Sequence, residues 1–150
     1  MTNLLNSYLA NLAVWQFKLH NFHWNVTGRM FVAVHEYTEK LYDEVFEQFD
    51  AVAEVLKMRN EMPLVTSAQY REAATIEEVD ARAFTVAEVL AAVEADMKFM
   101  ADLATKIRKE AADADDFQVQ SLMEGYLEGY AKQLWFLRAM KEGNCCSSQK

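Results

Sequence analysis

Residues 18–36, KLHNFHWNVTGRMFVAVHE, contain the end of one predicted helix, a short turn and the start of the next. All three histidines of the chain, His20, His23 and His35, lie in this stretch. Glycine can adopt the left-handed conformation that stops a helix, so Gly28 predicts the end of the first helix. We expect two long helices joined by a short turn, with His23 within reach of His35.

Four segments of the chain carry apolar side chains at alternating spacings of three and four residues, which is the period of an α-helix. The stripes run from Leu5 to Phe22, from Val34 to Leu56, from Val86 to Ile107 and from Val119 to Leu137. They predict helices at about 2–26, 31–60, 86–112 and 116–142. Gly143 is the expected stop of the last helix.

The connection over residues 61–84 is long for a plain loop. Within it, TSAQYREAA (66–74) begins with a helix-capping threonine and favours a short helix at about 66–72. A long second connection between short first and third ones predicts an all-α fold, the ferritin-like four-helix bundle, with a short extra helix in the crossover. We expect one domain over 1–150, with a tail at 143–150.

The composition of the chain narrows the classes of function that it can have. The chain has 23 acidic and 15 basic residues, a net charge of −8, which disfavours attraction to DNA or anionic lipid and suits a protein that handles cations. Its two cysteines, Cys145 and Cys146, are neighbours and predict no disulfide framework. Residues 2–17 carry no charge, but polar residues interrupt them and no signal-peptide pattern accompanies them. The cytoplasm is the expected location, without a membrane anchor.

The second predicted helix carries polar residues on a flank well round from its core stripe. At 100° per residue, this flank includes His35, Glu39, Asp50 and Glu54. Apolar residues alternate with them on the same flank: Val32, Tyr42, Phe46 and Ala53. A second apolar strip on a helix that already packs through its first one indicates contact with another chain.

His35 and Asp50 lie 15 residues apart, so roughly 22 Å separates them along one helix and they cannot bind one ion within one chain. If this helix packs antiparallel against its own copy, His35 of one subunit comes opposite Asp50 and Glu54 of the other. The site then joins His23 and His35 to two carboxylates of a second chain. Such a nitrogen and oxygen set suits Fe(II), zinc or manganese.

The pattern from His20 to Glu54 resembles the signature of Dps-like proteins, the mini-ferritins. It reads Leu19-His20-x-x-His23-Trp24-x-Val26-x-Gly28-x-x-Phe31-x-x-x-His35, then Tyr42 and Asp50-x-x-Ala53-Glu54. The resemblance implies a hollow shell of twelve subunits with ferroxidase sites at its two-fold interfaces. There two Fe(II) ions are oxidised, preferentially by hydrogen peroxide, and ferric mineral is stored inside.

Carried over by position, the resemblance implies that His23 and His35 are metal ligands from one subunit and that Asp50 and Glu54 come from its neighbour. Glu39 matches a carboxylate that touches either a second iron or a water, and Trp24 matches a tryptophan beside the site that can absorb a stray oxidising equivalent. Zinc can substitute for iron in such a site. His20 is read first as a structural histidine, with a supporting or transient iron role as the alternative.

This chain departs from the family pattern in two places: Val55 stands where an arginine is common, and Asn60-Glu61 replaces a glycine pair. DNA-compacting members carry a basic tail that this sequence lacks, which argues against a DNA-coating nucleoid protein. A helical assembly with structural zinc at the interface is the other alternative. The acidic segment EAADADD (110–116) is either helix punctuation or, in a shell, an iron-entry pore.

Overall fold

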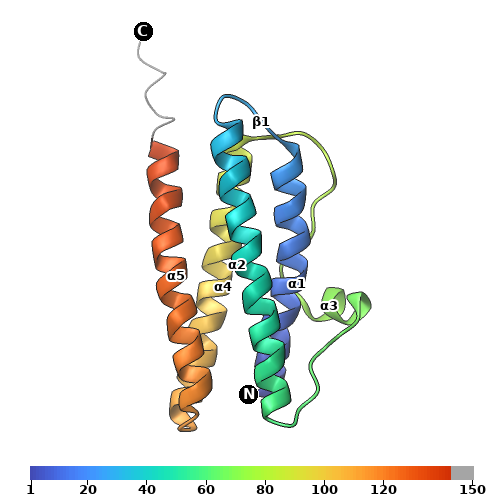
Figure 1. The fold of residues 1–150 in the computed structure, drawn as a ribbon, viewed down its shortest axis with the longest axis vertical. Coiled ribbons are helices and arrows are strands. Elements are labelled where there is room, and N and C mark those ends of the chain that lie inside the picture. Colours follow the sequence, from blue (N-terminus) through green and yellow to red (C-terminus); the bar gives the residue numbers. More distant parts are fainter. Residues whose placement is uncertain (143–150) are drawn as a thin grey trace. The chain divides into compact units, whose positions relative to one another are not determined.

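The computed structural model describes residues 1–142, which are almost entirely helical (Figure 1). The elements in chain order are α1 (Thr2–Asn25), β1 (Val26–Thr27), α2 (Phe31–Met58), α3 (Ser67–Ala73), β2 (Phe84–Thr85), α4 (Val86–Asp113) and α5 (Phe117–Glu142). Each helix begins and ends within two residues of its predicted limits. The expected stop at Gly143 and both cysteines lie outside the described residues.

The predicted apolar stripes are the buried side chains of the long helices. On α2 the core residues Val34, Leu41, Val45, Val52 and Leu56 are at most 2% exposed, as the three-four spacing predicts. On α1 burial extends beyond one stripe, and the intervening residues Leu9, Ala10, Asn11, Ala13 and Val14 are buried as well. The additional burial arises because α1 contacts both α2 and the crossover helix α3.

The chain forms two compact units, Met1–Val86 and the part that begins at Ala87. In the first, α1 and α2 lie side by side and α3 packs against α1 (Figure 1). Helix α3 has the predicted threonine cap: Thr66 accepts a hydrogen bond from the Gln69 amide, and the Gln69 side chain accepts one from the Thr66 amide. This reciprocal capping box explains why a helix of seven residues forms here.

Asn11 attaches the crossover to α1. Its side chain is fully buried, and its Oδ1 accepts hydrogen bonds from the amides of Thr75 (2.9 Å) and Ile76 (2.8 Å). Its Nδ2 donates to the Ser7 carbonyl at 2.8 Å. One buried side chain therefore provides the acceptor for two main-chain amides of the crossover.

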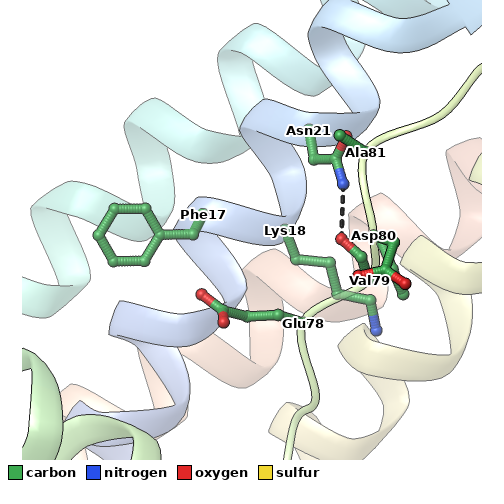
Figure 2. A pocket seen from close by; sticks show the side chains of 7 residues that line it. All are labelled: Phe17, Lys18, Asn21, Glu78, Val79, Asp80 and Ala81. Atoms are coloured by element: carbon green, nitrogen blue, oxygen red, sulfur yellow. Dashed lines mark hydrogen bonds between the residues drawn. The ribbon is translucent and has the colours of Figure 1, made fainter.

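Two further asparagines of α1 hold the crossover at its ends. Asn6 Oδ1 accepts a hydrogen bond from the Leu64 amide at 2.8 Å. Asn21 Nδ2 donates to the Val79 carbonyl at 2.8 Å, the bond drawn in Figure 2. Side-chain amides of α1 thus hold the crossover at several points along its length.

The turn between α1 and α2 differs in detail from the expectation. Helix α1 ends at Asn25 because Val26 is extended and pairs in parallel with Phe84, while Thr27 pairs with Thr85. Gly28 has a positive φ of 121°, but it shapes the loop before α2 rather than capping α1. The two-residue parallel pairing joins segments far apart in the chain, which no local period can predict.

In the second unit, α4 and α5 form an antiparallel pair linked by ion pairs. Lys141 pairs with Glu94, and Arg108 pairs with Glu124 at 3.9 Å. As residue numbers rise along α4, those of the partners fall along α5. Among residues 1–142, no helix combines the length and the apolar character needed to cross a membrane.

Candidate metal centre

His23 and His35 form a reciprocal pair where α1 ends and α2 begins. The Nδ1 atom of His23 lies 2.8 Å from the His35 carbonyl oxygen, and the Nδ1 atom of His35 lies 2.8 Å from the His23 carbonyl oxygen. The two rings are stacked, with centroids 3.7 Å apart and planes 18° from parallel. His23 is 6% exposed, and His35 is half-buried.

These bonds determine where the ring protons are. A carbonyl oxygen only accepts, so Nδ1 of each ring carries the hydrogen. In a neutral imidazole the other nitrogen, Nε2, then has a free lone pair. A ring N–H donated to a main-chain carbonyl is also the support that metal-bound histidines commonly have. In each ring, Nε2 is therefore the nitrogen with a lone pair to offer.

Aromatic side chains surround the histidine pair. Tyr42 meets the His23 ring edge-on at 5.3 Å between centroids, and Phe31 stacks on His35 at 5.1 Å. These contacts restrict ring rotation because a turned imidazole would collide with a neighbour. The short turn allows this packing, since it places the last turn of α1 beside the first turns of α2.

His20 belongs to the same aromatic cluster but not to the reciprocal pair. Its Nδ1 donates to the Gln16 carbonyl at 2.8 Å, and its ring stacks on Tyr42 at 3.9 Å. Trp24 lies 5.4 Å from the His20 ring and is 68% exposed. Trp24, which is predicted to absorb stray oxidising equivalents, is thus a surface side chain close to the aromatic cluster.

The predicted carboxylate ligands lie on the exposed side of α2. Glu39, Asp50 and Glu54 are all exposed in the single chain. Within residues 1–142 of one chain, His, Cys, Asp and Glu side chains form no group of three or more that could hold a metal ion. The structure therefore brings the two histidines together but leaves Asp50 and Glu54 apart from them.

The sequence pattern predicted the surroundings of Tyr42 only in part. It was predicted as an apolar member of the outer flank of α2, yet its ring bridges His20 and His23. Burial, followed by the negative charges of Glu39 and Asp43, raises the pKa of the Tyr42 hydroxyl. Both contacts are with residues of α1, so the spacing of residues along α2 could not have indicated them.

The acidic segment between α4 and α5 contains a helix cap. Asp116 Oδ1 accepts a hydrogen bond from the Val119 amide at 3.3 Å, in the first turn of α5. Asp115 has a positive φ of 53°, and Asp113 is exposed. The segment therefore ends one helix and caps the next, as one of the two interpretations predicts, and the iron-entry pore stays a prediction.

An open hollow of about 520 Å³ lies between α1 and the crossover (Figure 2). It is lined by Phe17, Lys18, Asn21, Glu78, Val79, Asp80 and Ala81. None of the predicted ligands is among these residues, and acidic and basic side chains share the lining. The hollow is therefore separate from the candidate metal centre.

Comparisons with known proteins agree with this architecture. A family model described as a ferritin-like domain matches residues 2–142. A DNA protection during starvation protein of Brevibacillus brevis is 34% identical over 139 residues, which is 93% of each chain. The crystal structure of a Dps protein from Bacillus brevis superposes with a TM-score of 0.87 at 34% identity, over 91% of each chain. That of antigen TpF1 from Treponema pallidum gives 0.91 at 29% identity, over 93% of this chain and 89% of the other.

Proposed function

Because the chain belongs to the Dps-like mini-ferritins of the ferritin-like family, we propose that it oxidises Fe(II) at sites shared by two copies and stores the ferric product. The observation that carries this proposal is the reciprocal bonding of His23 and His35. It leaves Nε2 of both rings free to bind a cation, with each ring supported by a carbonyl.

The remaining ligands are proposed to come from a second copy through an antiparallel contact along α2. Asp50 and Glu54 lie one helical turn apart and share a face, as a ligand pair should. Two apolar side chains on the same flank of α2, Val32 and Phe46, are 62% and 55% exposed in the single chain. Exposed apolar groups of this size favour burial against a partner. Glu39 is proposed as a further oxygen ligand.

The chemistry follows from having two irons at one site. Two Fe(II) ions supply two electrons, so hydrogen peroxide accepts both and, with two protons, becomes two molecules of water. A single Fe(II) supplies only one electron and would release hydroxyl radical. The carboxylates favour the product because hard oxygen ligands suit Fe(III) better than Fe(II). Zinc(II) would occupy the same ligands without reacting, and Trp24 would intercept a stray oxidising equivalent.

Storage requires a closed assembly, which we propose to be a shell of twelve chains. Twelve chains of 17.3 kDa would have a mass of about 208 kDa. The net charge of −8 per chain favours the accumulation of cations. A light-scattering mass near that of the dimer would contradict the shell without affecting the shared site. A mass near that of the single chain would contradict both.

A complementation experiment tests the shared site. His35→Ala chains keep the carboxylates, and Asp50→Asn chains keep the histidines, so each alone should oxidise iron poorly. In a mixed pair, one of the two sites receives an intact ligand from each chain. Random mixing at equal amounts should therefore restore about a quarter of the wild-type sites.

The two variants are co-expressed with different tags, and the mixed assemblies are isolated through both tags in succession. Oxidation is followed by stopped-flow absorbance after Fe(II) and then peroxide are added to the metal-free protein. If mixing restores nothing while light scattering shows normal assembly, the site is not shared. Glu72→Gln, an exposed carboxylate of α3, is the matched control and should retain wild-type rates.

Protection of DNA by direct coating is a second candidate, which the name of the Brevibacillus brevis relative favours. The net charge of −8 opposes it, because phosphate and acidic side chains repel each other. A gel-shift assay at low salt distinguishes the two candidates. Retardation of DNA by the metal-free protein would support coating, whereas protection that requires iron oxidation would support the ferroxidase.

A further inference from the structure

Thr38 stands in the core stripe of α2, and its side chain is completely buried. A valine would fill nearly the same space without a polar group to satisfy, so the hydroxyl at this position requires an explanation. The hydroxyl oxygen lies 3.4 Å from Nδ1 of His23, at the junction of the two histidines.

Counting the available protons shows which atoms donate and which accept in the hydrogen bonds around Thr38. The hydroxyl has one proton and two carbonyl acceptors, Val34 at 2.9 Å and His35 at 3.0 Å. Whichever carbonyl receives the proton, the oxygen keeps lone pairs that can accept. Since His23 Nδ1 already carries a hydrogen, the Thr38 oxygen is a second, longer acceptor for that N–H besides the His35 carbonyl.

We infer that Thr38 is a positioning residue for His23. Its hydroxyl, held by carbonyls of α2, supports the form of the ring with hydrogen on Nδ1 and thereby keeps the Nε2 lone pair available. Thr38 acts through His23 and is not itself a ligand. The effect on the ring is independent of the metal, whereas its consequence for cation binding rests on the proposed function.

The ring protons can be observed directly. Histidine labelled with ¹⁵N is recorded by magic-angle-spinning NMR on the assembled, metal-free protein at about pH 8.5, where an ordinary histidine is neutral. The His23 signals are those lost in His23→Gln. Wild type and Thr38→Ser should show hydrogen on Nδ1 alone. Thr38→Val should show a measurable share of the form with hydrogen on Nε2.

Cobalt(II), which is spectroscopically visible, measures the consequence for binding. Loss of a group that supports a metal-bound histidine typically weakens binding by about 10–100-fold. We expect Thr38→Val to bind cobalt(II) about tenfold more weakly than wild type and Thr38→Ser to stay within about twofold. If Thr38→Val fails to assemble, the same measurements are compared between Thr38→Ala and Thr38→Ser, which differ by only the hydroxyl.

Thr105→Val is the matched control. The Thr105 hydroxyl on α4 donates to the Ala101 carbonyl at 2.8 Å. Thr38 makes the same kind of bond to the carbonyl four residues earlier, that of Val34. Thr105→Val therefore tests the loss of such a bond alone, without a neighbouring histidine. Unchanged ring signals and cobalt(II) affinity in Thr38→Val would overturn the inference, as would equal losses in the serine and valine variants. If wild type binds no cobalt(II), the proposed function fails, and the NMR comparison alone decides the role of Thr38.

Discussion

His23 and His35 each donate a ring hydrogen bond to the main-chain carbonyl of the other, at 2.8 Å in both directions. Because the acceptors belong to the backbone, replacing one histidine removes its ring but leaves the acceptor that holds the other ring. Each single variant therefore tests one nitrogen ligand at a time. This separation is unusual for residues in direct contact, whose substitutions commonly affect one another.

Replacement of either His23 or His35 by glutamine should weaken cobalt(II) binding and slow iron oxidation on the order of a hundredfold, because it removes a proposed nitrogen ligand. The binding is measured by titration and the oxidation by stopped-flow absorbance. His20→Gln is the control, since His20 lies in the same aromatic cluster but outside the reciprocal pair. A larger loss in His20→Gln than in His35→Gln would reverse the assignment of ligands.

Asn11→Ala should lower the free energy of unfolding by about 3 kcal/mol, because it leaves the amides of Thr75 and Ile76 without their acceptor. Chemical denaturation at constant chain concentration measures the loss. Hydrogen exchange should accelerate at these two amides. Asn21→Ala removes one exposed bond to the crossover and should cost less than about 1 kcal/mol. Equal effects of the two substitutions would show that burial at Asn11 is unimportant.

Gly28→Ala should destabilise the protein by about 1–3 kcal/mol, because a φ of 121° is strained for any side chain. Space is not the cause, since an added Cβ would meet Val86 at an ordinary 3.9 Å. Gly125→Ala on α5 should instead stabilise by up to about 1 kcal/mol, because alanine favours the helix. Among the described residues, nothing lies within 4 Å of a Cβ at that position. Thermal unfolding of the two variants should thus shift in opposite directions.

Glu94 provides a pH-dependent prediction. Hydrogen bonds from Lys141 and then Lys98 lower the pKa of its carboxyl from 4.5 to about 2. A lowered pKa in the folded state stabilises the protein above pH 4.5, and the contribution is lost as pH falls through about 2. The stability difference between wild type and Glu94→Gln should therefore be constant near neutral pH and shrink in acid.

The size of this difference should be at most about 1 kcal/mol, because both lysines are partly exposed to solvent. Chemical denaturation of both proteins, from neutral pH into acid, measures this stability difference. Added salt at about 1 M should reduce the difference, since the charges are screened. A difference that grows on acidification would show that the lysines do not stabilise the Glu94 carboxylate.

Much of the fold could be predicted from the sequence. The three-four spacing along 34–56 predicted which side of α2 is buried, and Thr66 predicted the cap of α3. Both are properties of neighbouring residues on one helix, where geometry is repetitive. The ferritin-like arrangement also followed from the lengths of the connections and is confirmed by the match over residues 2–142.

The amino-acid sequence by itself determined where the helices lie, which faces they bury and that His35 shares a flank of α2 with Glu39, Asp50 and Glu54, because helical periodicity is local. Only the tertiary structure decided that His23 and His35 exchange carbonyl bonds, that Thr38 turns its hydroxyl toward them and that Val26 pairs with Phe84. These contacts join residues on different elements. They depend on the depth and angle at which α1 and α2 pack, which no pattern along a single helix contains.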